Sequence, residues 1–389
     1  MKTFENNKKT YFAYSVIKKS LFIWFVFLIY LRGKGLSYTQ ALLLDSIAAG
    51  VTILFEIPSG IIADRYNRKK LILVGEIFSI CNYILLMLFD QYYIFIFGAI
   101  LNGLGEACVS GSGEALIYDS FQSVNKEKEY LPYIARLSKW GLRCAAVATL
   151  ISSFLYDVRT ELPIFCSIIL GICGIIFVSQ MKETRESIKV DKAEKTLIKE
   201  GLREQWYNLK SITTNKEIIK IFLLFVVMLE IISTINYSSQ TFLPYLGLHV
   251  KYIGIVFFVF SIVSSFGAKH AAKIKLKGEV MVTVYGGLLI LLSLSNIYLA
   301  IPLLMISRYI NGFIWLILNA ETNSMIESHN RATMLSYRSL FAQLAPLVFD
   351  PMVGVIFDSV GMRWAYVIMG GVLLFTVLCT HFWKNQRKR

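Results

Sequence analysis

The sequence predicts an all-α membrane protein with twelve transmembrane helices in two groups of six. Three observations predict this class. Of the 389 residues, 56% are apolar and the mean hydropathy is +0.57, which is typical of a polytopic membrane protein and not of a soluble one. The apolar runs reach the roughly 20 residues that a helix needs to cross about 30 Å of hydrocarbon. Basic residues recur in alternate connections, as expected for loops that stay in the cytoplasm.

Hydropathy places each span in order along the chain. The first six spans are expected at about 11–31, 39–60, 71–89, 92–115, 137–155 and 163–181. The second six are expected at about 218–240, 253–271, 280–296, 300–322, 334–356 and 365–383. The domains predicted from them are an N-terminal six-helix bundle (1–181), a cytoplasmic linker (182–217) and a C-terminal six-helix bundle with a basic tail (218–389).

The linker and the charges of the loops predict the topology. Within 182–217, apolar residues recur at helical spacing, which predicts an amphipathic helix at the membrane surface. The outer connections carry few cations, so both termini are expected in the cytoplasm. We therefore expect a multi-pass protein of a bacterial plasma (inner) membrane, with the lipid bilayer as its surroundings.

Composition argues against several other classes. The net charge of +14 is spread over the connections and not gathered in one domain, so it does not predict nucleic-acid binding. The six cysteines all fall in apolar spans without metal-like spacing. No nucleophile–base grouping or nucleotide loop is present in the sequence. We therefore expect no enzyme activity, no cofactor and no metal.

The connection between spans 2 and 3 is the most informative stretch. Residues 60–70 read GIIADRYNRKK, which places one acid and four cations in a short turn led by a glycine. The cations predict a cytoplasmic loop. Gly60 would let the helix end approach a neighbour closely, and Asp64 suits a helix N-terminus, where the backbone favours an anion.

This stretch, with its lead-in from Glu56, resembles the signature loop of the major facilitator superfamily, whose pattern is G-x-x-x-D-R-x-x-R-K. Four further stretches carry the resemblance, at 36–40, 110–120, 331–336 and 351–363. The likeness covers nearly the whole chain and is nearest to bacterial drug and metabolite efflux-type members. It implies the major facilitator fold, monomeric by default, with a central cavity lined by spans 1, 4, 7 and 10.

The resemblance also implies an inner gate. In it, Asp64 would cap span 11 and Arg68 would pair with Asp119. The expected gating residues are Gly60, Asp64, Arg65, Arg68, Asp119 and Glu56. Glu76 and Glu114 are expected to join this gate and not the central cavity.

Charged residues inside the spans predict where the transport chemistry lies, because they are costly there and face an interior cavity. Lys18, Glu106, Glu230 and Arg308 fall on spans 1, 4, 7 and 10. The polar or aromatic residues expected beside them are Asn102, Asn311, Trp315 and Tyr237. Each charge also has a structural alternative: Lys18 could extend to the cytoplasmic interface, Glu106 could only bond a neighbouring helix, and Glu230 could pair permanently with Arg308.

The function that these residues predict is proton-coupled export of a small organic compound by alternating access. Glu106 would be the main proton-carrying group, with Glu230 modulated by Arg308. One alternative keeps the fold and makes the chain an importer or exchanger of an anionic metabolite held by Lys18, Arg143 and Arg308. It gains weight because span 5 lacks the Gly-Pro-rich pattern of many proton-driven antiporters. A second alternative is a protein that senses or flips lipid instead of transporting.

Overall fold

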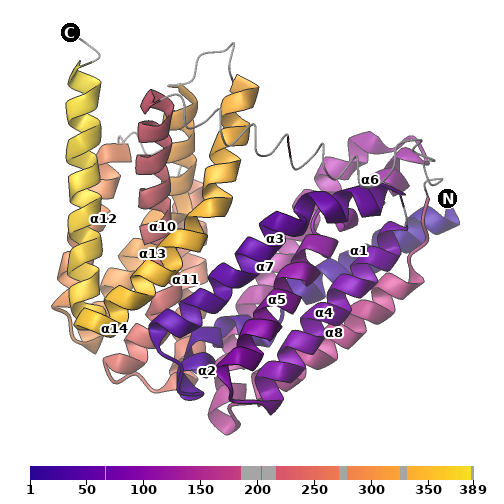
Figure 1. The fold of residues 1–389 in the computed structure, drawn as a ribbon, viewed down its shortest axis with the longest axis horizontal. Helices are drawn as coiled ribbons and strands as arrows, with labels where there is room; N and C mark the ends of the chain where they lie inside the picture. The colour runs from indigo at the N-terminus through magenta and orange to yellow at the C-terminus, as the bar shows by residue number, and fades with distance from the viewer. Residues whose placement is uncertain (66, 185–202, 204–215, 271–277, 325–330, 387–389) are drawn as a thin grey trace. The chain divides into compact units, whose positions relative to one another are not determined.

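The computed structural model describes residues 1–65, 67–184, 203, 216–270, 278–324 and 331–386, and this part of the chain is helical without strands. Figure 1 shows the helices along the chain. In the first part they are α1 (Lys2–Lys19), the 3-10 helix η1 (Phe22–Phe25), α2 (Phe27–Gly33), α3 (Tyr38–Arg65), α4 (Arg68–Leu88), α5 (Tyr92–Val109), α6 (Ser112–Gln122), α7 (Glu127–Val158) and α8 (Leu162–Gln180). In the second part they are α10 (Lys216–Tyr245), α11 (Val250–His270), α12 (Gly278–Ser293), α13 (Ile297–Ser324) and α14 (Arg331–Gln386).

The helices pack into two compact units. The first unit comprises Met1–Phe27 and Leu44–Trp206, and the second comprises Leu28–Leu43 and Tyr207–Arg389. Each has its own apolar core: aromatic and aliphatic side chains such as Phe121 lie at the centre of one, and Tyr366 lies in the other. The predicted surface helix of the linker lies almost wholly outside the described residues.

The membrane-spanning character of the helices agrees with the hydropathy. Among the described residues, nine helical segments are long and apolar enough to cross a membrane, and α12 is a shorter apolar helix. The count of twelve spans stays a prediction.

The first span is broken, although its hydropathy predicts one continuous helix. α1 ends at Lys19, and η1 and α2 follow with non-helical backbone at Leu21 and Val26. The Ser152 hydroxyl donates to the Phe22 carbonyl (2.7 Å), and the Ile23 amide donates to the Ser167 hydroxyl (3.0 Å). These two hydroxyls satisfy backbone groups that a break inside a bilayer would otherwise leave without partners.

Two glycines mark further departures from the predicted spans. Span 4 divides into α5 and α6 at Gly111, whose φ of 70° is readily adopted only by glycine. Spans 11 and 12 follow each other within α14 and turn at Gly361, whose φ is 79°.

The packing of α4 on α5 depends on glycine for a different reason. A Cβ on Gly75 would lie 2.7 Å from the Gly105 carbonyl oxygen, and a Cβ on Gly105 would lie 2.7 Å from the Gly75 carbonyl oxygen. The two backbones are therefore in direct contact, as at other small-residue helix interfaces in membranes. This contact brings the next residue of each helix, Glu76 and Glu106, to neighbouring positions.

In the second unit, α14 holds the start of α3. Asp358 accepts hydrogen bonds from the Tyr38 and Thr39 amides (2.9 and 2.8 Å) and from the Thr39 hydroxyl (2.6 Å). A carboxylate at this position satisfies orphan amides and complements the helix dipole. The N-terminal end of α3 is thus anchored to α14.

Candidate functional site

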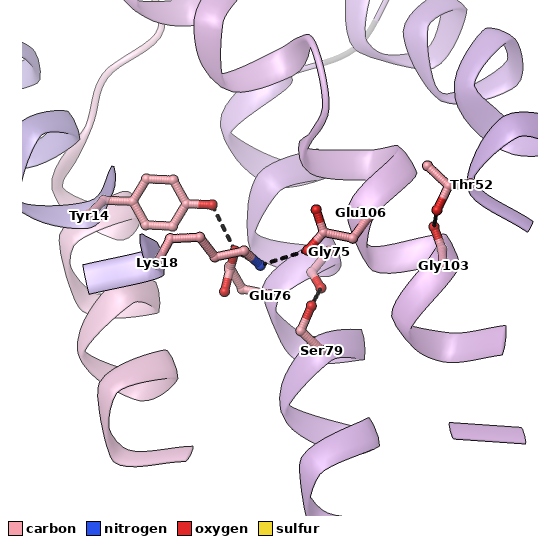
Figure 2. Close-up of polar contacts among 8 residues, drawn as sticks. All are labelled: Tyr14, Lys18, Thr52, Gly75, Glu76, Ser79, Gly103 and Glu106. Carbon is pink, nitrogen blue, oxygen red and sulfur yellow. Dashed lines mark hydrogen bonds and ion pairs between the residues drawn. The ribbon is translucent and has the colours of Figure 1, made fainter. Parts of the chain in front are cut away.

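A cluster of charges lies inside the first unit, where α1, α4 and α5 meet (Figure 2). The Lys18 ammonium lies 3.0 Å from Glu76 Oε1 and 3.3 Å from Glu106 Oε1. The Tyr14 hydroxyl donates to the same Glu76 oxygen at 2.7 Å. One ammonium group therefore lies within ion-pair distance of two carboxylates. The cluster carries a net charge of −1 when both carboxylates are ionised.

The two carboxylates of this cluster differ in exposure. The Glu76 side chain is 4% exposed and accepts from both Tyr14 and Lys18, whereas the Glu106 side chain is 42% exposed and contacts Lys18. Glu76 is thus the buried counter-ion of Lys18, and Glu106 is the more exposed of its two carboxylate partners.

Part of this cluster was predicted from the sequence and part was not. Lys18 points inward to the two glutamates, so it does not extend to the interface, whereas the neighbouring Lys19 is exposed with its stem against Gly141. Glu76 was expected at the inner gate, and this is wrong: α4 turns it toward Lys18. The signal that was missed is its place directly after Gly75, at a close helix contact.

A pocket lies beside the cluster in the first unit, at the break in the first span. Aromatic and aliphatic side chains from η1, α2, α3, α4 and α5 form most of its wall, with four polar side chains among them. The residues that line it are Ile23, Trp24, Phe27, Leu44, Asp45, Ala48, Asn82, Tyr83, Leu86, Phe95, Ala99 and Asn102. The buried Asn102 Oδ1 accepts no hydrogen bond. An apolar pocket with a few polar groups is typical of small-molecule sites.

A second polar cluster lies within the second unit, around Arg308 of α13. The guanidinium donates to the Asn236 carbonyl (2.9 Å) and the Ser239 hydroxyl (2.9 Å), both on α10. It also lies over the rings of Phe257 and Phe260 of α11, at 5.3 and 5.4 Å from their centroids. Asn311, one turn further along α13, donates to Asn236 Oδ1 at 2.8 Å.

The pairing of Glu230 with Arg308 expected from the sequence is wrong. Both side chains are described, and the charged or phenolic groups within electrostatic reach of Arg308 are Tyr285 and Tyr366, with no carboxylate among them. Glu230 instead lies within electrostatic reach of Asp350. The hydrogen bonds of Arg308 go instead to Asn236 and Ser239. The sequence does not single out these two residues, because Glu230 is the charged residue of the same helix.

The other residues predicted for the second unit have different surroundings. Tyr237 packs against the apolar core of that unit. The side chain of Trp315 lies outside the described part of the chain.

The start of α4 shows part of the expected gate. Arg68, whose side chain is buried, forms an ion pair with Asp119, as the resemblance implies. The Lys69 amide donates to Glu183 (3.3 Å), whose pKa is raised by burial, and the Lys69 ammonium donates to the Ser179 carbonyl (2.6 Å). These contacts join α4 to α6 and to the end of α8.

The remaining gate residues differ from expectation or are not described. Among the described residues, a Cβ on Gly60 would meet nothing within 4 Å, and its predicted gating role stays a prediction. Glu56 is half-buried on α3. The side chains of Asp64 and Arg65 lie outside the described residues, so their predicted roles stay predictions.

The family is shown by sequence. A model of the Major Facilitator Superfamily matches residues 10–326, so the chain belongs to this superfamily of membrane transporters. It is 21% identical over 367 residues to an uncharacterized MFS-type transporter, YxaM, of Bacillus subtilis (strain 168), covering 91% of this chain and 89% of that one. The chain is therefore a multi-pass membrane transporter and not an enzyme.

Solved structures share its fold at low sequence identity. The crystal structure of the nucleoside transporter NupG matches with a TM-score of 0.76 at 12% identity, over 97% of this chain and 98% of that one. The POT family transporter PepTSo matches with a TM-score of 0.66 at 12% identity, over 100% of this chain and 98% of that one. A D-xylose–proton symporter matches with a TM-score of 0.60 at 12% identity, over 96% of this chain and 95% of that one. These likenesses concern the fold alone.

Proposed function

We propose that this chain is a proton-coupled secondary transporter of a small organic compound, in which Glu106 carries the proton and Lys18 senses its charge. The observation that carries the proposal is the Lys18 cluster: one ammonium within 3.3 Å of two carboxylates, of which only Glu106 is substantially exposed. Charged groups inside spans are costly and are kept where they serve transport.

Proton uptake by Glu106 would change the balance of this cluster. With Glu106 ionised, the Lys18 ammonium is shared between two carboxylates. With Glu106 protonated, the ammonium is held by Glu76 alone and the cluster becomes neutral. The state of Glu106 thus changes the contacts between α1 and α5, while Glu76 stays fixed between Tyr14 and Lys18.

The neighbouring pocket is the proposed place for part of the substrate. Its wall includes Asn102, which lies one turn before Glu106 on α5, and Tyr83, which lies within electrostatic reach of both Lys18 and Glu106. A substrate group that donates a hydrogen bond would satisfy Asn102 Oδ1. Proton and substrate would then act on the same helix, which gives them a route to coupling.

The direction of transport is proposed as export, following the resemblance to efflux-type members. Import by symport is the second candidate. It is favoured by the buried Arg308, which has no carboxylate partner in the described part of the chain and so suits an anionic nutrient, and by the likeness in fold to a proton symporter. For either direction we place the protein in a bacterial plasma membrane with both termini in the cytoplasm.

The test is accumulation of a panel of dyes, antibiotics and labelled small metabolites. Cells lacking their major efflux pumps would express the wild type, Glu106→Gln, or the control Glu129→Gln, whose acid is half-exposed in an ion pair with Lys126 at the start of α7. Each would be assayed with and without a protonophore. Export predicts lower accumulation of at least one compound with the wild type and Glu129→Gln, lost with the protonophore and in Glu106→Gln.

The same assay separates the two directions and can refute the coupling role. Higher accumulation with the wild type, again lost with the protonophore, would establish import instead of export. Proton-dependent transport that persists unchanged in Glu106→Gln would refute Glu106 as the coupling group.

A further inference from the structure

The Arg308 cluster contains a buried cation that has no counter-ion among the described residues. Arginine does not lose its proton in proteins, so burial cannot neutralise it. Its described contacts are two hydrogen bonds to neutral oxygens and two aromatic rings, with no carboxylate within electrostatic reach. A buried ion in these surroundings is strongly destabilising unless an anion joins it.

Among the described residues, two polar atoms of this cluster are buried without a hydrogen-bond partner: Arg308 Nε and Asn311 Oδ1. Arg308 and Asn311 are one turn apart on α13 and therefore lie on the same face. The hydroxyl of Tyr285 on α12 lies within electrostatic reach of Arg308 and within hydrogen-bonding reach of Ser307 and Asn311. Buried polar atoms in proteins are nearly always hydrogen-bonded, so two on one helix face indicate a missing ligand.

The chemistry of the two atoms defines the ligand groups that would satisfy them. Arg308 Nε is a donor and carries positive charge, so it requires an anionic acceptor. Asn311 Oδ1 is an acceptor, so it requires a donor. A carboxylate with a hydroxyl or amino group on the adjacent carbon supplies both partners within one small group.

We infer that the Arg308 cluster binds a 2-hydroxy- or 2-amino-carboxylate group of the transported compound, with the carboxylate on Arg308 and the adjacent donor on Asn311. This inference deepens the proposed function: that the compound is transported rests on that proposal, whereas the binding at Arg308 is argued independently of it. A single guanidinium with neutral companions suits a monoanion better than a phosphate dianion, because the second charge of a dianion would have no partner.

The test uses three matched probes on the purified full-length protein in detergent at fixed pH and chloride concentration. Lactate carries both groups, propionate lacks the hydroxyl, and methyl lactate lacks the charge. Binding would be measured by calorimetry and by the shift in unfolding temperature. We expect lactate to bind more tightly than propionate, and methyl lactate not to bind.

Variants assign the binding to the cluster. Arg308→Gln is expected to weaken lactate binding by at least about thirtyfold, as for other charge partners buried in an interface. Asn311→Ala should remove the difference between lactate and propionate. Arg136→Gln is the matched control: it removes the same charge from an exposed position on α7 and should bind lactate as the wild type does.

Two further variants keep the test decisive if Arg308→Gln does not fold. Arg308→Lys keeps the charge but has no Nε donor, and Tyr285→Phe removes one hydroxyl; both should weaken binding without abolishing it. Equal binding of lactate and methyl lactate, or equal lactate binding by wild type and Arg308→Lys, would overturn the inference. The inference would also be overturned if chloride or phosphate raised the unfolding temperature and lactate raised it no further. That result would indicate that the cluster binds an inorganic ion.

The same measurements distinguish this inference from the proposed function. Because no proton gradient is present in detergent, Glu106→Gln should bind lactate normally even though its coupling is lost. Normal lactate binding with proton-independent transport would refute the coupling role alone. Proton-dependent transport without lactate binding would refute the Arg308 site alone.

Discussion

The two units each bury a charged cluster, but they compensate it differently. In the first unit the Lys18 ammonium lies between two carboxylates. Around Arg308 of the second unit, the contacts from described residues are neutral oxygens and aromatic rings. The first cluster thus has its cation paired within the protein, whereas no described carboxylate lies within electrostatic reach of the Arg308 guanidinium. In the proposed function, coupling belongs to the first unit and anion recognition to the second.

The largest effect is expected from removing the fixed counter-ion. Glu76→Gln leaves the Lys18 ammonium with the half-exposed Glu106 only, so we expect the free energy of unfolding to fall by about 3 kcal/mol. Glu106→Gln makes the same chemical change at an exposed partner of the same ammonium, and should cost at most about 1 kcal/mol. Denaturant unfolding of the two purified variants measures both. Equal losses would mean that the two carboxylates are equivalent, which contradicts the division of roles between them.

The next effect concerns the helix contact that brings the carboxylates together. Gly105→Ala places a methyl group against the Gly75 carbonyl, and α4 and α5 must separate, at a cost of about 1–3 kcal/mol. Glu106 would move away from Lys18, so transport should fall as well. The control is Gly287→Ala on α12, where a Cβ meets nothing within 4 Å and stability should not fall. Thermal unfolding and the accumulation assay provide the two readouts, and a stable, active Gly105→Ala protein would contradict the contact.

A smaller effect is expected from the hydroxyl that holds Glu76. Tyr14→Phe removes one hydrogen bond to a buried carboxylate and should lower the free energy of unfolding by about 1.5 kcal/mol. Transport should persist, because Lys18 and Glu106 are unchanged. The control is Tyr245→Phe, since Tyr245 is exposed. Loss of proton dependence in Tyr14→Phe would instead make this hydroxyl part of the coupling machinery.

The smallest effect is expected at Glu230, the acid that the sequence alone pairs with Arg308. Glu230→Gln should leave the affinity of the second unit for lactate within about twofold of the wild type, as for sites that share no partner. Calorimetry on the two proteins measures this. A tenfold or greater change would mean that Glu230 and Arg308 interact after all, and the second unit would then resemble the first.

Much of the fold was predictable because hydropathy reports the length and order of apolar helices directly. The breaks in the first and fourth spans were not predictable, because their residues are as apolar as those of an unbroken helix. At Ser110–Gly111 the glycine is informative only once its positive φ is known. At Leu21–Val26 the compensating hydroxyls come from Ser152 and Ser167, more than a hundred residues away.

The candidate site was predictable in its members but not in its pairings. Lys18, Glu106 and Arg308 were expected because a charge within a span is conspicuous in any apolar sequence. Which charges meet depends on how each helix is rotated and how far it is shifted along its neighbours. For this reason Glu76 was assigned to the gate although it contacts Lys18, and Glu230 was assigned to Arg308 although Asn236 and Ser239 hold it.

The anchoring of α3 by Asp358 has a consequence for the division of the chain into units. Leu28–Leu43 belongs to the second unit, so the chain changes unit after Phe27 and again after Leu43. At the first change the backbone is already interrupted at Val26. At the second change α3 continues as one helix from Tyr38 to Arg65. Asp358 therefore caps a helix whose first residues belong to the second unit and whose remainder belongs to the first.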